Sequence, residues 1–256
     1  MGLKAHPGFK SPSLRTVIQV PSHGEVGAVT TFGLVHGAYH GAWCWGPTVA
    51  ELERRGHRAL TVDLPCEDST AGAAAYAAAA VDAFAGADDD LVVVGHSLGG
   101  LTIPLVAHAR PVQRLVYLCA MLPRLGRTQD DVIDDEPEML LPSSGGGPYR
   151  GDDGASHWHP EDAARRFFSD CSPEVAIWAA QRLRGQRWQI TQEITPLVAW
   201  PNVPSSYVLG VADPIVNPEW SRRVVPGVLG VEPIEIAAGH SPFLSAPVAL
   251  VDALEG

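Results

Sequence analysis

The most informative part of the sequence is LVVVGHSLG, from Leu91 to Gly99. Its first four residues form a short apolar run, which is typical of a central parallel strand buried on both faces. The other five match G-x-S-x-G, and a helical pattern of apolar residues begins at Leu101, so the order of strand, turn and helix is the one this motif requires. At such a sharp turn the serine hydroxyl is exposed at the start of the helix, whose dipole favours a developing oxyanion. The stretch therefore predicts that Ser97 is a nucleophile.

Strand and helix patterns alternate on both sides of this stretch. Such alternation predicts an α/β fold, with a mostly parallel sheet covered by helices on both faces. A helix is expected from Pro47 to Arg55, because a proline stands early in it and Gly56 follows its end. The alanine-rich stretch after Thr70 is expected to form another. Further strands are expected at residues 31–35, 60–64, 114–119, 205–209 and 232–236.

The chain of 256 residues is long enough for one large domain with a substantial core. We predict that residues 29–122 and 205–256 form this core and that residues 123–204 form a cap inserted between two strands. Short helices are expected in the cap near Pro160 and Pro173, the second with Ser172 as its N-cap. A long disordered loop is the alternative, but aromatic residues such as Phe167 and Trp188 need a place to pack. Residues 1–28 follow no element pattern and are expected to be a peripheral N-terminal extension.

A serine hydroxyl needs a base to remove its proton and an acidic residue to orient that base. In the sequence after a G-x-S-x-G turn, the acidic residue comes first and the histidine second. Asp213 and His240 follow the last two expected strands, so both fall at carboxyl ends of strands, where the loops converge on Ser97. Asp213 could instead form a turn before Pro214, and His240 could be an ordinary loop histidine. We assign Ser97, Asp213 and His240 as a catalytic triad.

Two backbone N–H groups are predicted to form an oxyanion hole. His36, Gly37 and Ala38 follow the first expected strand, from which the second donor of such a hole comes. The hole is therefore assigned to the N–H groups of Ala38 and Leu98. His36 is interpreted as a structural residue that holds this loop rather than as a base. His96 is interpreted in the same way, because the turn needs only its backbone.

Metal and redox sites are not expected. His157 and His159 lie near Asp152 and Asp153, but two histidines without further ligand spacing are weak evidence, and a solvated loop is the preferred interpretation. The four cysteines lie far apart and form no CxxC pair, which favours free thiols in a reducing compartment. We expect no metal site.

The charge balance limits the class of partner. With 29 acidic against 18 basic residues, the formal net charge of −11 disfavours nucleic acid and anionic membrane surfaces. No run of about 18 apolar residues is present to span a bilayer, and the start of the chain lacks the apolar region of a signal peptide. A soluble, cytoplasmic protein that acts on a small-molecule ester is expected. The oligomeric state is left open, with a homodimer as one option.

Four stretches resemble the plant methyl esterase and hydroxynitrile lyase family and its bacterial esterase relatives: LVHGAYHGAWCW (34–45), RRGHRALTVDL (54–64), VVVGHSLGGL (92–101) and GHSPFLSAP (239–247). The resemblance covers the core and not the inserted segment. It implies an α/β-hydrolase fold with a helical cap and no cofactor, and it maps the triad onto the three residues assigned above.

The same resemblance argues against two other reactions. The lyases of this family carry Thr after the first oxyanion-loop histidine and Lys after the catalytic histidine. Here Gly37 and Ser241 occupy these places, which is the esterase pattern. Haloalkane dehalogenases and epoxide hydrolases of the same fold carry Asp where this chain has Ser97.

The expected reaction is attack by Ser97 on an ester carbonyl, followed by release of the acyl-enzyme by water. A lyase or C–C bond hydrolase with the same triad is one alternative, and a non-catalytic ligand-binding receptor of the same fold is another. The pocket is expected to offer no cation for a carboxylate or phosphate, so neutral, largely apolar esters or lactones are the expected substrates. The residues expected to line it are Tyr39, Trp43, Cys119, Met121, Trp158, Phe167 and Trp178.

Overall fold

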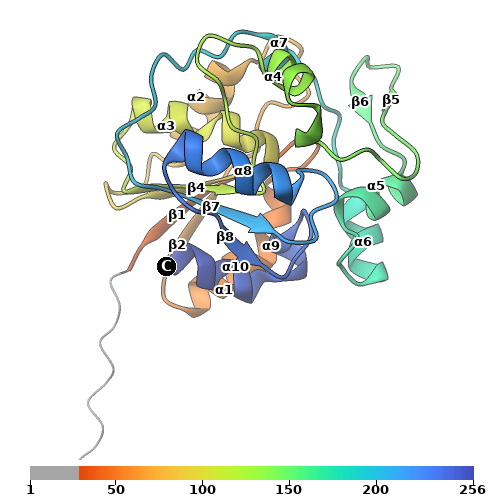
Figure 1. Cartoon of the computed structure of the whole chain (residues 1–256). Helices are drawn as coiled ribbons and strands as arrows, with labels where there is room; N and C mark the ends of the chain where they lie inside the picture. The colour runs from red at the N-terminus through yellow and green to blue at the C-terminus, as the bar shows by residue number, and fades with distance from the viewer. Residues whose placement is uncertain (1–28) are drawn as a thin grey trace, which may run out of the picture.

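The computed structural model describes residues 29–256, so the N-terminal extension expected for residues 1–28 lies outside the described residues. A six-stranded sheet in the order β2-β1-β3-β4-β7-β8 forms the centre of the molecule, and each neighbouring pair of strands in it is parallel (Figure 1). The strands are β1 (Thr31–Val35), β2 (Arg58–Thr61), β3 (Val92–His96), β4 (Arg114–Leu118), β7 (Ser205–Gly210) and β8 (Ile234–Ile236). The α/β fold class predicted from the alternation of elements is confirmed.

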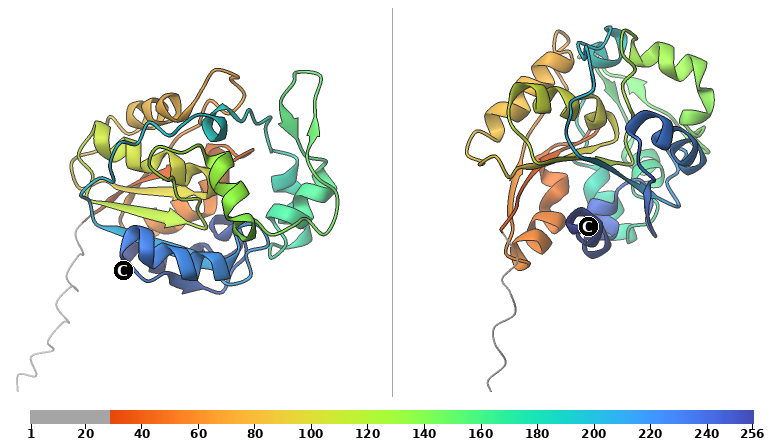
Figure 2. Two further views of the ribbon diagram at one scale, coloured as in Figure 1. Left: turned by 45° about the horizontal axis from the view of Figure 1, so that its top comes forward. Right: turned by 60° about the vertical axis from the view of Figure 1, so that its left-hand side comes forward.

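Helices cover both faces of this sheet, and Figure 2 shows the resulting layers. One face packs against α2 (Ala73–Ala83), α3 (Ile103–Ala109) and α8 (Pro218–Leu229). The other packs against α1 (Gly46–Arg54), α9 (Pro242–Ser245) and α10 (Pro247–Glu255). Side chains of β3 alternate between the two cores, because Val93 belongs to the first and Val92 and Val94 to the second. An unbroken apolar run is therefore the pattern that a strand with two buried faces needs.

Three strands are shorter than the sequence predicts. β4 ends at Leu118 instead of at residue 119, and the other two are shorter for identifiable reasons. Residues 60–64 were expected to form a strand, but β2 ends at Thr61. The backbone N–H of Leu64 donates to Nε2 of His36 at 3.0 Å and so is directed to a side chain instead of to the sheet. β8 begins at Ile234 rather than at residue 232, because Pro233 has no N–H to contribute to a ladder.

Residues 123–204, here called the inserted segment, connect β4 to β7. They contain the 3₁₀ turn η3 (Pro137–Met139), a small antiparallel hairpin of β5 (Tyr149–Arg150) and β6 (Ser156–His157), and the helices α4 (Gln129–Asp135), α5 (Pro160–Phe167), α6 (Pro173–Ala180) and α7 (Gln189–Gln192). The predicted N-cap is confirmed, since the Ser172 hydroxyl accepts a hydrogen bond from the N–H of Val175. In Figure 1 and in the left view of Figure 2 the hairpin, α5 and α6 stand to one side of the sheet.

Within residues 29–256, no helix has the length and apolar character needed to cross a bilayer.

Candidate active site

Ser97 occupies a strained turn between β3 and the 3₁₀ helix η2 (Ser97–Leu101). Its φ angle of 51° is positive, a conformation that a residue with a side chain seldom adopts. The turn closes only because its neighbours are small: a Cβ atom on Gly95 would lie 2.7 Å from a methyl carbon of Ile103, and one on Gly99 would lie 2.8 Å from the carbonyl oxygen of His36. Ser97 is 6% exposed, so the turn directs its side chain into a largely enclosed region of the molecule.

Asp213 and His240 lie at the ends of the two strands β7 and β8, and their side chains meet. Nδ1 of His240 donates to Oδ2 of Asp213 at 2.8 Å. The other oxygen of Asp213 accepts the N–H groups of Ile215 at 2.7 Å and Val216 at 3.1 Å. Because the carboxylate can only accept, His240 carries its proton on Nδ1 in this contact and presents an unprotonated Nε2 when neutral. The described part of the chain shows no hydrogen bond between that nitrogen and the hydroxyl of Ser97.

Three other histidines surround this pair and act through hydrogen bonds to the backbone. His36 bonds to the carbonyl of Gly37 through Nδ1 and accepts the N–H of Leu64 at Nε2, which confirms its interpretation as a structural residue. His96 donates from Nε2 to the carbonyl oxygen of His240 at 2.8 Å. His40, which the sequence analysis did not single out, donates from Nδ1 to the carbonyl oxygen of Ala38 at 2.7 Å.

Burial determines the charge of these three side chains. Desolvation lowers the pKa of His36 to about 4 and that of His40 to about 3, and it also lowers the pKa of His96 well below the ordinary value. All three are therefore neutral at neutral pH, and each holds a loop around Ser97 without adding a charge.

The backbone N–H groups of Ala38 and Leu98 have no acceptor among the described residues. Gly37 lets this loop approach the turn, since a Cβ atom there would lie 2.8 Å from Cβ of Ser97. The bond from His40 fixes the carbonyl of Ala38. Two donors beside Ser97 are thus left free for an outside acceptor.

An aromatic cluster from the inserted segment surrounds Tyr39, the residue after Ala38. Its ring centroid lies 6.3 Å from that of Trp158, 5.8 Å from that of Phe167 and 5.6 Å from that of Trp188. The ring centroid of Phe167 also lies 6.5 Å from that of His240. The structure therefore brings Tyr39, Trp158 and Phe167, three of the seven residues predicted to line a pocket, together beside His240.

The other four predicted pocket residues lie elsewhere. Trp43 stacks on His40 and contacts Trp178, which is 40% exposed at the surface of α6 and carries Arg182 over its ring at 4.2 Å. Met121 is buried behind the turn, where its N–H donates to the carbonyl oxygen of Ser97. Cys119 is 1% exposed, and its Sγ lies within 4.8 Å of ligand atoms of Asp213 and His240. Cys119 thus lies beside Asp213 and His240, and Trp178 packs on Trp43.

The group of Cys119, Asp213 and His240 is the set of described side chains whose ligand atoms are close enough to share a metal ion. Nδ1 of His240 already donates to the carboxylate, so its lone pair is not available to a cation. Burial also raises the pKa of the Cys119 thiol, and a protonated thiol is a poor ligand. These three residues therefore do not fit a metal site.

Two polar residues of the inserted segment hold the loops of the site, and the sequence analysis identified neither. Oε1 of Gln186 accepts the N–H of Tyr39 at 3.2 Å. Oδ2 of Asp170 accepts the N–H of Gly239, directly before His240, at 2.6 Å. Both are single polar residues in an irregular stretch, so no local pattern could have pointed to them.

Comparisons with known proteins identify the family of this chain. The model of the alpha/beta hydrolase family matches residues 34–253. Esterase PIR7B of Oryza sativa subsp. japonica is 30% identical over 250 residues, which cover 87% of this chain and 93% of the relative. The carbendazim hydrolyzing esterase of a Nocardioides species is 37% identical over 127 residues, 44% of this chain and 50% of the relative. Probable esterase PIR7A of Oryza sativa subsp. indica matches over 46% of its length, at 35% identity.

Solved structures share the fold. Polyneuridine aldehyde esterase superimposes with a TM-score of 0.73 at 22% identity, over 89% of this chain and 98% of that structure. A pyrethroid hydrolase from Sphingobium faniae JZ-2 superimposes with a TM-score of 0.70 at 24% identity. The match covers 89% of this chain and 96% of that structure. Because the family model matches most of the chain, the turn at Ser97 and the sheet that carries it place this chain in the alpha/beta hydrolase family.

Proposed function

We propose that this chain is a serine hydrolase that cleaves a small, largely apolar carboxylic ester or lactone through an acyl-enzyme. Ser97 attacks the carbonyl carbon, while His240 accepts the proton of its hydroxyl and later gives it to the leaving alcohol. Asp213 orients His240 and stabilises the imidazolium that forms. Water, activated by His240, then releases the acid and restores Ser97.

The hydrogen bond between Asp213 and His240 is the observation that carries this proposal. Both side chains are almost fully buried, so their geometry is held without competition from water. The bond commits Nδ1 of His240 to the acid and leaves Nε2 as the base, as the reaction requires. A further support is that the N–H groups of Ala38 and Leu98 are free, since two such donors would stabilise the oxyanion of the tetrahedral intermediate.

The relatives support ester hydrolysis as the reaction class. PIR7B, PIR7A and the Nocardioides protein are all named as esterases. The aromatic cluster of Tyr39, Trp158, Phe167 and Trp188 supports an apolar substrate, because aromatic rings and the absence of a charged group among them favour neutral ligands.

A fluorophosphonate probe tests this assignment. The probe reacts with an activated serine, so mass spectrometry should find the label on Ser97, and His240→Gln should abolish labelling. Ser245→Ala, which changes a serine at the end of α9, is the matched control and should be labelled like the unmodified protein. Analysis of the products of a short-chain ester should then yield the free acid and alcohol. An unlabelled Ser97 would favour a binding protein, and a C–C cleavage product would favour a lyase.

A further inference from the structure

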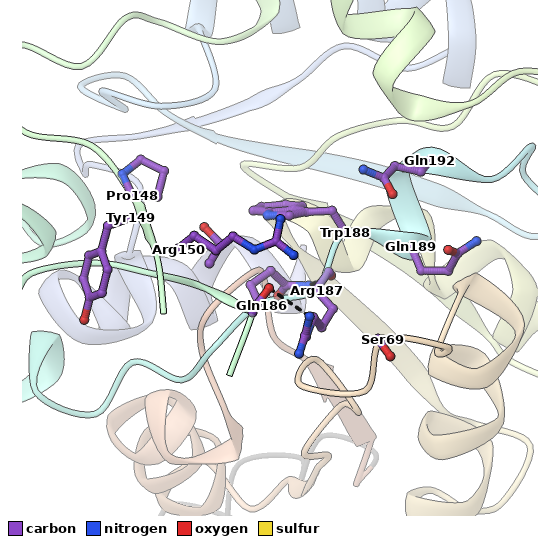
Figure 3. Close-up of a pocket in the computed structure, with 11 residues that line it drawn as sticks. Ser69, Pro148, Tyr149, Arg150, Gln186, Arg187, Trp188, Gln189 and Gln192 are labelled. Carbon is purple, nitrogen blue, oxygen red and sulfur yellow. Dashed lines mark hydrogen bonds between the residues drawn. The ribbon is translucent and has the colours of Figure 1, made fainter. Parts of the chain in front are cut away.

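A cavity of about 360 Å³ lies between the β5–β6 hairpin and the segment that leads into α7. Ser97, Asp213 and His240 do not line it, so it is separate from the candidate active site. Figure 3 shows Arg150, Arg187 and Trp188 pointing into its middle, with Ser69, Gln189 and Gln192 on the opposite side from Pro148.

The lining of this cavity is positively charged, although the whole chain carries a formal charge of −11. Two arginines line it, and no Asp or Glu does. Arg150 is exposed and has neither a hydrogen-bond nor an ion-pair partner among the described residues. No carboxylate that lines the cavity therefore neutralises the guanidinium of Arg150.

Arg187 is held by backbone carbonyls instead of by an acid. Its Nη1 donates to the carbonyl oxygen of Gly154 at 2.8 Å, and its Nη2 donates to that of Asp153. Its Nε is buried without a partner. The carboxylate of Asp153 binds His157 at 3.0 Å and forms no ion pair with Arg187. Its pKa is lowered by the N–H of Ala155, by His157 and, to a smaller degree, by the charge of Arg187.

We propose that this cavity binds a small organic carboxylate with a flat apolar body. A guanidinium matches a carboxylate with two parallel N–H donors, and this pairing is stronger where water is partly excluded. The indole of Trp188 supplies a flat apolar wall, and the side chains of Ser69, Gln189 and Gln192 can bond to further polar groups without adding charge. The volume is within the range of sites that hold small molecules.

This site goes beyond the proposed hydrolysis, but it shares a wall with the active site. Ser156, Gln186 and Trp188 line the cavity and also contact Tyr39. The hydroxyl of Tyr39 lies 2.9 Å from Oγ of Ser156, and its N–H is bound by Gln186. Tyr39 therefore separates the two sites.

Calorimetry on the full chain tests the proposal, with 3-phenylpropionate as probe and the uncharged 3-phenylpropanamide as its matched control. The protein carries Ser97→Ala, so the result does not depend on whether Ser97 is catalytic. The acid is expected to bind at least about tenfold more tightly than the amide, and added salt is expected to shrink this difference.

Arginine variants assign the binding to this cavity. Arg150→Gln is expected to weaken the binding of 3-phenylpropionate about tenfold without affecting folding, because this side chain makes no contact that the fold needs. Arg187→Gln is expected to weaken the binding of 3-phenylpropionate at least as much. If Arg187→Gln fails to fold, Arg150→Gln decides the test. Arg58→Gln removes the same charge from an arginine that bonds to the carbonyl of Gly86, and it should leave affinity unchanged.

Three results would overturn the proposal. They are equal affinity for the acid and the amide, unchanged affinity in Arg150→Gln, and binding of inorganic phosphate as tight as that of 3-phenylpropionate. The last result would indicate a site for simple anions in which Trp188 has no part.

Discussion

The carboxylate of Asp213 accepts the Nδ1 proton of His240 at 2.8 Å, in a place where the two side chains are 2% and 1% exposed. The same carboxylate is held from its other oxygen by the N–H groups of Ile215 and Val216. Its direction is thus fixed by the backbone of its own loop, and the ring of His240 is fixed in turn. This chain of contacts leads to definite expectations for single substitutions.

Replacing Ser97 by alanine is expected to abolish ester turnover and leave the fold intact. The strained turn depends on the small residues Gly95 and Gly99 and not on the hydroxyl. Turnover of a chromogenic ester and the thermal unfolding midpoint are the two measurements. A loss of only a few-fold in kcat would mean that another residue is the nucleophile.

Asp213→Asn is expected to lower kcat by about 10³ to 10⁴ while changing KM little, because the amide stabilises the wrong tautomer of His240. The steady-state kinetics of the variant give both numbers. Asp170→Asn serves as the comparison: its side chain keeps an oxygen that can accept the N–H of Gly239, so a much smaller effect is expected. Near-normal kcat in Asp213→Asn would point to a different acid.

Gln186→Ala is expected to lower kcat about tenfold by loosening the loop that carries Ala38. The substitution leaves the N–H of Tyr39, whose φ angle is 65°, without its acceptor, and an unsatisfied buried donor costs about 1–3 kcal/mol. Gln181→Ala, at an exposed position at the end of α6, is the control and should behave like the unmodified protein. Unchanged kcat in Gln186→Ala would show that Tyr39 does not position the oxyanion donors.

A neutral ester is expected to be a better substrate than an anionic one of similar shape. The aromatic cluster beside His240 contains no cation, and Tyr39 separates Arg150 and Arg187 from Ser97. The comparison is kcat/KM for p-nitrophenyl butyrate against the mono-p-nitrophenyl ester of succinate, at low and high salt. A higher kcat/KM for the succinate ester at low salt would contradict this expectation.

The free energy of unfolding is expected to fall as the pH drops from about 6.5 towards 4. His36 and His40 have a pKa of about 4 and about 3 in the folded protein, so only the unfolded chain binds protons in this interval. The contribution of these histidines to the free energy of unfolding is therefore fully present above the pKa that they have in the unfolded chain. Below that pKa the free energy of unfolding falls by up to about 1.4 kcal/mol per pH unit for each histidine. Urea unfolding at several pH values measures the slope, which should be smaller in His40→Gln. An unchanged slope in that variant would contradict the neutral, buried state of His40.

Local patterns in the sequence were sufficient to predict the sheet and the position of the turn at Ser97. The apolar run of Val92 to Val94 predicts a strand buried on both faces, and the glycines after it predict a turn that only small residues allow. Parallel strands bring their carboxyl ends to one edge, so the order of Ser97, Asp213 and His240 along the chain was enough to expect them in one place.

The contacts between the inserted segment and this edge of the sheet could not be predicted from local sequence. Gln186 binds Tyr39 across 147 residues of sequence, and Asp170 binds Gly239 across 69. Trp178, which was expected to line the pocket, is 40% exposed and packs on Trp43. Arg150 and Arg187 line a cavity that no sequence motif predicted. A periodic pattern predicts which face of a helix or strand is buried. A single polar contact between two irregular loops depends instead on where the folded backbone places those loops. The residues next to such a contact in the sequence do not indicate where its partner lies.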